Sequence, residues 1–349
     1  MGAYILKRLL LMIPTLFGVM LVTFTVTQFV PGGPVEQLIE QLQGAGSHGE
    51  ATGTTLRLYR GDAGLDEERL EELKALYGFD KPAYQRFLEM IGNYATFDLG
   101  ESYYHQRSVM ALIISKLPVS ISLGMWTFSI VYLTCVPLGI AKAVRDGTPF
   151  DIASSTVILV GYAIPGFVLG IVLLVLFGGG SFWDVFPLRG LVSDNWEELS
   201  LFGKITDYLW HITLPVISLV VGSFAVMTML TKNSFIEELR KQYVLTARAK
   251  GLLQNRVLYR HVFRNAMIPL VTGFPAAFIG AFFTGSILIE TIFSLDGLGL
   301  LSYDSIMKRD YPVVLGTLYL FTLLGLLAKL VTDLCYVLID PRIQFGAAK

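Results

Sequence analysis

Long apolar runs alternate with polar segments along the whole chain. Residues 9–30 are apolar almost without interruption, and a helix of this length crosses about 30 Å of hydrocarbon. Further runs of this kind follow at residues 118–142, 152–177, 212–231, 266–289 and 312–339. The pattern predicts an all-α membrane protein with six membrane-spanning helices.

The first apolar run has two readings, because a cleaved signal peptide also begins with an apolar stretch. The core of a signal peptide is usually shorter and ends at a cleavage site of small residues. Here the run continues into Phe29-Val30-Pro31-Gly32-Gly33-Pro34 instead. We therefore interpret residues 1–30 as a retained N-terminal membrane helix.

A polar insert, residues 31–117, separates the first two spans. Short helices are predicted within it at residues 35–43, 67–77 and 81–96. The second of these follows Asp66, which suits a helix N-cap, and ends at Gly78. Six glycines in residues 44–64 predict an irregular loop. We interpret the insert as a small helical domain outside the membrane, with a spacer that binds no partner as the alternative.

A basic loop at residues 232–265 separates the fourth and fifth spans. It holds only two acidic residues, against the basic residues Lys232, Arg240, Lys241, Arg248, Lys250, Arg256, Arg260 and Arg264. Polar segments on this side of the predicted topology carry 14 basic and five acidic residues, whereas those on the other side carry 12 basic and 22 acidic ones. Because basic residues beside spans mark the cytoplasmic side, we expect this loop and both termini there.

The same loop contains a helix–glycine–helix pattern. Residues 243–250 favour a helix, Gly251 interrupts it, and residues 254–265 favour a second helix that leads into the next span. Glycine is the usual residue where a helix stops with a positive φ. Such an element is suited to bearing force from a soluble partner, although a plain solvated loop is the simpler alternative.

The amino-acid sequence of this loop resembles that of a known protein family. TARAKG at residues 246–251 and RHVFRNAMIP at residues 260–269 resemble the cytoplasmic signature loop of ABC-importer permeases, specifically the dipeptide/oligopeptide (Dpp/Opp) branch. Within that branch the chain is most similar to the B-type permeases of Yej peptide importers. Motifs from the rest of the chain that share the resemblance are RLLLMIPTLFGVML with PGGP, YGFDKP, FDLGESY, PLRGLVS, ETIFSLDGLG and RDYP.

This resemblance implies a fold, partners and a substrate class. The fold is the type I ABC-importer permease, with residues 118–349 as the core transmembrane domain in a bacterial inner membrane. Two ATP-binding subunits, a second permease subunit in a heterodimer and a periplasmic substrate-binding protein are the implied partners. ATP and Mg would be bound by the partner subunits and not by this chain. The implied substrates are peptides, either oligopeptides or peptide antibiotics such as microcin C.

The resemblance also implies a coupling helix at residues 243–252 that docks in a cleft of the ATPase. Ala247 and Gly251 match the permease signature, whereas Thr246 and Arg248 depart from the acidic-Ala-Ala opening of the wider superfamily. Arg248 and Lys250 are the expected charge partners of that cleft. The residues expected to couple the chain to the ATPase are Tyr243, Ala247, Arg248, Lys250, Gly251 and Leu252.

Catalytic motifs are absent from the sequence. It contains no G-x-x-x-x-G-K-[ST] phosphate loop, no H-E-x-x-H metal motif and no G-x-S-x-G elbow. We therefore expect that the chain is not an enzyme and binds no metal, and its net charge of −1 suggests no nucleic-acid partner. Two other hypotheses stay open: an ATP-independent secondary carrier or channel, and a membrane-anchored scaffold or sensor.

Ionisable residues within the spans are few, which argues against coupling ions. Lys329 and Asp333 are four residues apart, so they share one helix face and are predicted to pair, with a proton relay as the alternative. Pro165, in the middle of the third span, predicts a kink that lines a pathway or simply packs. The residues expected along the translocation path are Tyr162, Pro165, Met227, Thr228, Thr284 and Ser286.

Overall fold

The computed structural model describes residues 2–29, 81–179, 182–283 and 286–339. The described residues are mostly helical and contain no extended strand, which confirms the all-α prediction. The helices predicted at residues 35–43 and 67–77, and the loop at residues 44–64, lie outside the described residues. The helix predicted at residues 81–96 is present as α4.

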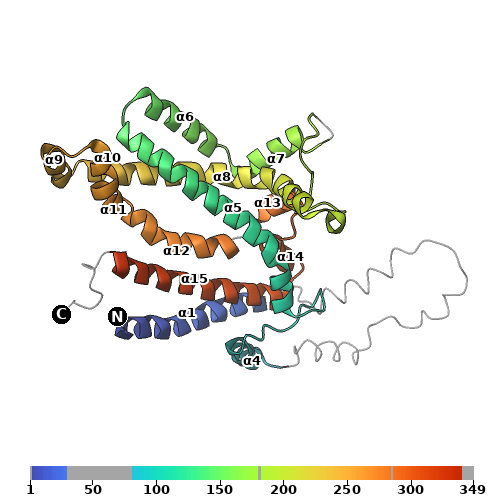
Figure 1. The fold of residues 1–349 in the computed structure, drawn as a ribbon. Coiled ribbons are helices and arrows are strands. Elements are labelled where there is room, and N and C mark those ends of the chain that lie inside the picture. The colour runs from blue at the N-terminus through green and yellow to red at the C-terminus, as the bar shows by residue number, and fades with distance from the viewer. Residues whose placement is uncertain (1, 30–80, 180–181, 284–285, 340–349) are drawn as a thin grey trace, which may run out of the picture. The chain divides into compact units, whose positions relative to one another are not determined.

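Helices of very different length follow one another along the chain (Figure 1). Their bounds are α1 Gly2–Phe29, α4 Ala83–Ala95, α5 Val109–Val144, α6 Pro149–Ala163, α7 Gly166–Phe177, α8 Leu201–Leu239, α9 Gln242–Ala249, α10 Gln254–Val257, a π turn Leu258–Val262, α11 Phe263–Ala266, α12 Ile268–Phe283, α13 Ile287–Ile292, α14 Leu298–Met307 and α15 Tyr311–Ile339.

Four of the described helices are long and apolar enough to cross a membrane, namely α1, α5, α8 and α15. Two bent pairs raise this number to six if each pair is one span. The first is α6 with α7, and the second is the segment from α10 to α11 with α12. Five of the six apolar runs fall on the four long helices and on the α6–α7 pair. The fifth run falls mainly on α12, whereas the segment from α10 to α11 lies in the basic loop.

The third span departs from the prediction of one kinked helix. Residues 152–177 fall on α6 and α7, which meet at 90°. Ile164, directly before Pro165, has an extended conformation (φ −89°, ψ 118°) and ends α6. A proline disfavours helical geometry in the preceding residue, and here that preference separates two helices.

Three helix ends differ from the ends of the apolar runs. Pro118, at the start of the second run, lies inside α5, which already begins at Val109. The helix α8 begins at Leu201, before the fourth run at residues 212–231. The helix α12 ends at Phe283, within the fifth run, and an extended Ser286 (φ −106°) precedes the short helix α13.

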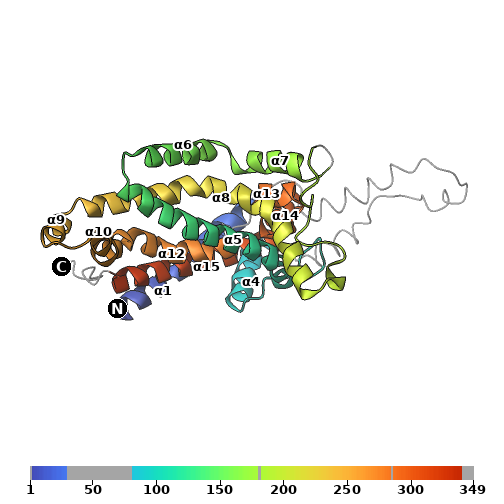
Figure 2. The ribbon, with the colours of Figure 1, turned by 45° about the horizontal axis from the view of Figure 1, so that its top comes forward.

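The chain forms two compact units. The first comprises Met1–Leu9, Ile114–Tyr303 and Phe321–Lys349. Within it, α6 and α7 lie along α8 (Figure 2). A buried apolar cluster from α5, α8, α13 and the turn after α13 fills its interior, formed by Leu123, Val131, Cys135, Ile212, Leu214, Val216, Val220, Ile289, Phe293 and Leu295.

The second unit comprises Leu10–Ile113 and Asp304–Leu320. Phe87 of α4 is buried, and its ring centroid lies 5.4 Å from that of Phe17 and 5.3 Å from that of Phe24, both on α1. The buried Asp310 accepts hydrogen bonds from the Ser102 hydroxyl (2.5 Å) and the Tyr103 backbone N–H (3.1 Å). The second unit therefore joins the FDLGESY and RDYP motifs.

Candidate coupling element and transport pathway

The helix α9 ends in a glycine turn, as the sequence predicts. Gly251 has a φ of +80°, a conformation that costs other residues energy. Its N–H donates to the Arg248 carbonyl (2.9 Å), and the Leu252 N–H donates to the Ala247 carbonyl (3.3 Å). These two bonds are those of a Schellman motif, which satisfies the last carbonyls of a helix. The helix–glycine–helix element is thereby confirmed.

An apolar cluster holds the inner face of α9. Val244 is fully buried and Ala247 is 8% exposed. The cluster joins α9 to α5, α8 and the segment from α10 to α11 through Ile140, Ala143, Phe235, Val244, Ala247, Val257, Leu258, Val262 and Ala266. Ala247, which is expected to belong to the coupling element, packs inward. Its small side chain lets α9 lie close to the rest of the first unit.

Tyr243 adds polar contacts at the start of α9. Its hydroxyl donates to the Glu238 carboxylate at the end of α8 (2.7 Å) and accepts from the Asn265 amide (3.4 Å). Burial, followed by the hydrogen bond to Glu238, raises the pKa of Tyr243. Lys241 also forms an ion pair with Glu238. Like Ala247, Tyr243 supports α9 from within.

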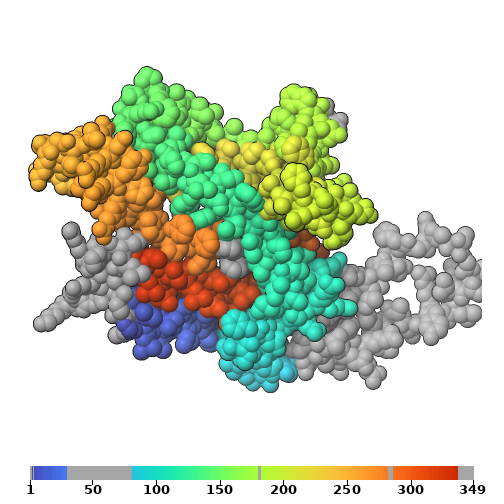
Figure 3. All heavy atoms as spheres, viewed as in Figure 1, coloured from blue at the N-terminus to red at the C-terminus, as the bar shows by residue number. Residues whose placement is uncertain are grey.

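The outer face of α9 and the following turn are exposed. Arg248 and Lys250 lie there, and their contact with an ATPase cleft stays a prediction. Leu245 and Leu253 lie there too, with 57% and 79% of their surfaces exposed. Figure 3 shows the surface of α9 to α11, in orange, projecting beside that of α5 and α6. Two large exposed leucines beside two basic residues give α9 and its turn the mixture of side chains found in protein-binding surfaces.

The residues predicted along the translocation path do not share one environment. Tyr162 and Pro165 are exposed near the α6–α7 break, and Met227 packs on the interior cluster. Ser286 is half-buried at the start of α13, and Thr284 lies outside the described residues.

Thr228, which is predicted to line the path, has a fully buried side chain. It lies where Gly139 of α5 approaches α8, so closely that a Cβ on Gly139 would be 2.8 Å from the Thr228 carbonyl oxygen. Its place on the path stays a prediction.

Comparison with known proteins shows the family of this chain. Residues 135–345 match the family described as binding-protein-dependent transport system inner membrane component. The chain belongs to this family. It is 56% identical to the peptidoglycan transport system permease protein YejB of Agrobacterium fabrum and 53% identical to the inner membrane ABC transporter permease protein YejB of Escherichia coli O157:H7, with 99% of each chain covered. It is 35% identical, with the same coverage, to the di/tripeptide transport system permease protein DppB of Pseudomonas aeruginosa.

These relatives confirm the resemblance of the permease to the Yej type and to the Dpp/Opp branch. The matched region begins at Cys135 and contains α6 to α15 entire. It therefore includes α9 and its glycine turn. The permease is an inner membrane component, as the sequence predicts.

The predicted pairing of Lys329 with Asp333 is wrong. The Asp333 carboxylate in α15 of the permease lies 2.7 Å from the Arg8 guanidinium and accepts a hydrogen bond from the Tyr4 hydroxyl (2.9 Å). Lys329 is exposed and has no ion pair among the described residues. A guanidinium binds a carboxylate with directed hydrogen bonds, and Tyr4 supports it from the adjacent turn.

Sequence reasoning about the permease missed Leu245 and Leu253 as surface residues. The sequence does contain a signal that Leu245 is exposed. Val244 and Ala247 share one face of the helix, whereas Leu245 and Arg248 share the other. Leu253 precedes a helix of only four residues, where no periodicity indicates which side chains are buried.

Proposed function

We propose that this permease carries peptides into the bacterial cytoplasm and that ATP hydrolysis on two partner subunits drives the transport. It forms one half of a heterodimer of permeases and receives its substrate from a periplasmic binding protein. The observation that carries the proposal is the construction of α9. Its inner face is anchored in a buried cluster, and its outer face presents exposed basic and apolar side chains.

The anchoring of α9 explains how a soluble partner moves membrane helices. A push on an exposed loop is absorbed by the loop, whereas a push on a packed helix displaces what it packs against. The cluster beneath α9 contains residues of α5 and α8, both long enough to span a membrane. Docking and release of α9 in an ATPase cleft therefore switch the permease between two orientations.

The proposed topology puts α9 and both termini in the cytoplasm. The basic excess of residues 232–265 supports this orientation, and so do Lys142 at the end of α5 and Arg145 in the short turn that follows it. Residues 1–30 form the N-terminal membrane helix, residues 31–117 the periplasmic insert and residues 118–349 the core. ATP and Mg bind to the partner subunits.

Peptides are the substrate class that the relatives support. One relative is named for di/tripeptide transport and another for peptidoglycan transport. Peptide groups are common to both substrates, because peptidoglycan carries short peptides. We therefore propose oligopeptides as the substrates, with peptide antibiotics and peptidoglycan-derived peptides as members of the class.

Uptake by reconstituted vesicles tests the function. We expect a labelled oligopeptide to accumulate only when both permeases, both ATP-binding subunits, the binding protein and ATP are present. An excess of unlabelled peptidoglycan-derived peptide should reduce the uptake. Accumulation by the permeases alone would support the ATP-independent carrier instead.

Leu253→Glu is expected to weaken assembly with the ATP-binding subunits. Burying a leucine in an interface contributes about 1.5–3 kcal/mol, so its loss corresponds to roughly 10- to 100-fold weaker binding. Leu201→Glu is a matched control, because Leu201 is 78% exposed at the other end of α8. Titration of detergent-solubilised permease with the ATP-binding subunits measures the affinity. Equal affinities for the two variants would remove Leu253 from the interface.

A further inference from the structure

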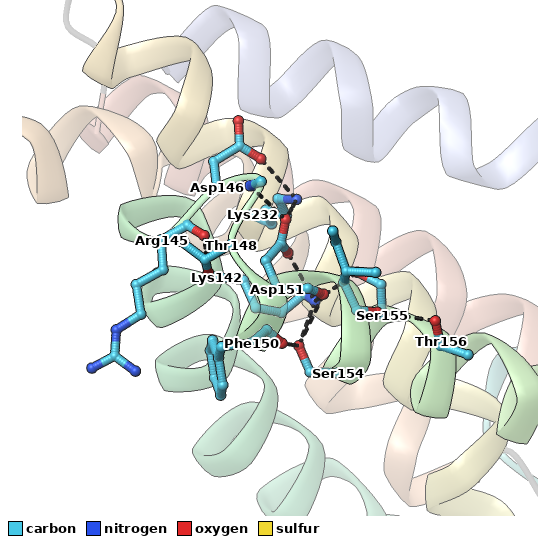
Figure 4. Close-up of polar contacts among 12 residues, drawn as sticks. Lys142, Arg145, Asp146, Thr148, Phe150, Asp151, Ser154, Ser155, Thr156 and Lys232 are labelled. Carbon is cyan, nitrogen blue, oxygen red and sulfur yellow. Dashed lines mark hydrogen bonds and ion pairs between the residues drawn. The ribbon is translucent and has the colours of Figure 1, made fainter.

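A buried lysine, Lys142, lies near the end of α5. Its side chain is fully inaccessible to solvent. The Nζ donates to the Asp151 carbonyl (2.8 Å) and to the hydroxyls of Ser154 and Ser155 (2.7 Å each), and it lies 3.0 Å from Asp151 Oδ1 (Figure 4). An ammonium group carries three donors, and all of them are occupied here by groups of α6.

Asp151 extends these contacts to α8. Its Oδ2 accepts a hydrogen bond from Lys232 Nζ (2.6 Å) and from the Gly147 N–H (3.1 Å). Lys232 Nζ also lies 3.0 Å from Asp146 Oδ1. Lys142, Asp151 and Lys232 are largely buried, and each has a partner of opposite charge, which is the condition under which buried charges are tolerated. The more exposed Asp146 also lies 4.0 Å from Arg240. We call Lys142, Asp146, Asp151 and Lys232 the charge joint.

The helix α6 lies along α8, but few of its side chains are buried. Of its 15 residues, Asp151 and Ile158 are the buried ones. Its outer face is apolar and open, with Val157 72% and Val160 60% exposed. Near its end, α6 approaches α8 at Gly161, where an added Cβ would lie 3.2 Å from Val221. At the start of α6 the charge joint links this helix to α5 through Lys142 and to α8 through Lys232.

The charge joint is also continuous with the cluster beneath α9. Ile140 and Ala143, on either side of Lys142 in α5, belong to that cluster together with Val244 and Ala247 of α9. In α8, Phe235 of the same cluster lies one turn after Lys232. A displacement of α9 reaches α5 and α8 through apolar contacts, and from there reaches α6 through the ion pairs.

We propose that the charge joint makes α6 move with the block of α5, α8 and α9 during the ATP-driven step. Its members are positioning residues, since they act through helix placement. The proposal rests on the proposed function, because it assigns to α6 a share in the movement that α9 initiates. Breaking the joint should let α9 follow the ATPase while α6 lags behind, so hydrolysis continues without transport.

The test is the number of peptides taken up per ATP hydrolysed by the complete complex in vesicles. We expect Asp151→Asn to retain stimulation of the ATPase by the binding protein within about twofold, because α9 is intact. We expect the same variant to lower the number of peptides taken up per ATP at least about fivefold. A loss of roughly one kcal/mol of coupling free energy produces a change of this size. Glu197→Gln is the matched control, since it removes an exposed ion pair with Lys204 on the opposite end of α8. An unchanged ratio in Asp151→Asn would overturn the proposal.

A rescue separates positioning from a general loss of structure. In a protein with Cys135→Ala and Cys335→Ala, the pair Gly161→Cys and Val221→Cys can form a disulfide between α6 and α8, because the Cβ of residue 161 would adjoin Val221. Oxidation of this pair in Asp151→Asn should restore uptake per ATP, and reduction should abolish it again. If the closed disulfide does not restore the number of peptides taken up per ATP, the proposed role of the charge joint is wrong.

Two further outcomes are decisive. If Asp151→Asn does not assemble, Lys232→Gln takes its place, because it removes the ion pairs of α8 with Asp146 and Asp151 and leaves the contacts of Lys142 with α6 in place. A normal ratio in that variant would overturn the proposal. If the unmodified complex shows no ATP-driven uptake, the proposed function is wrong, and so is the proposal that the charge joint moves α6. ATP-driven uptake by the unmodified complex together with a normal ratio in Asp151→Asn overturns the joint alone.

Discussion

Gly251→Pro is expected to leave the permease in the membrane and to abolish ATP-driven uptake. Proline fixes φ near −65°, whereas Gly251 has a φ of +80°, and proline cannot donate the hydrogen bond to Arg248. The glycine turn then opens, and α9 loses its orientation on the buried cluster. Proline in a helix interior costs about 3 kcal/mol. A free-energy cost of this size corresponds to a roughly 100-fold decrease in the fraction of molecules in which α9 has its native position.

The measurement is ATP-dependent peptide uptake in reconstituted vesicles, with binding-protein-stimulated ATPase activity determined in parallel. Gly190→Pro is the matched control, because Gly190 also has a positive φ (+83°) and its N–H donates to Phe293 (3.1 Å), at a site far along the chain from α9. We expect Gly190→Pro to keep the ratio of uptake to hydrolysis. Uptake by Gly251→Pro at the unmodified rate would show that the turn has no part in coupling.

Gly124→Ala is expected to disrupt the packing of α5 on α12. An added Cβ would overlap the backbone carbonyl of Ala281, and a backbone group cannot rotate away as a side chain can. The two helices must then separate, and overpacking of this kind costs typically about 1–3 kcal/mol and sometimes more. We expect a lower yield of folded permease and a melting temperature reduced by several degrees, or roughly 2–4 °C for each kcal/mol in a domain of 150–250 residues.

Gly222→Ala supplies the control for that substitution. Gly222 lies inside α8, and an added Cβ there meets nothing within 4 Å. Because alanine favours the helix more than glycine, this variant should be neutral or slightly stabilising. Thermal unfolding in detergent, followed by size-exclusion chromatography of the soluble fraction, compares the two variants. Equal melting temperatures would show that α5 and α12 do not approach each other as closely as described.

The apolar runs and the glycine turn could be predicted because each follows from a local rule. A run must match the thickness of the hydrocarbon, so its length alone indicates a span. Gly251 could be assigned because few residues besides glycine accept its backbone angles. Neither inference depends on what the segment packs against.

The break at Pro165 could be located but its size could not be predicted. A proline predicts a disturbance at a particular residue, and the neighbouring helix decides its angle. Here Gly166 lies so close to α8 that an added Cβ would be 2.8 Å from the Ser218 carbonyl, and α7 packs along α8 in its own direction. That contact depends on residues about 50 positions away, which no local pattern contains.

Charged side chains near the spans were the least predictable part. Spacing favours Lys329 as the partner of Asp333, yet the partner is Arg8, from the opposite end of the chain. Lys142 reads as an ordinary residue of a basic turn, and its complete burial depends on the two serines and the aspartate of α6. Pairing between residues distant in sequence is a property of the tertiary fold.

Photo-crosslinking from α9 tests the central claim most directly. A photoreactive residue replaces Leu245, which is 57% exposed on the outer face of α9, in vesicles that contain the complete complex. The same residue at Leu201, at the far end of α8, serves as the control. We predict that position 245 crosslinks to an ATP-binding subunit, with a yield that changes on ATP addition, and that position 201 does not. Crosslinks from position 245 only to lipid or to the periplasmic binding protein would contradict the account.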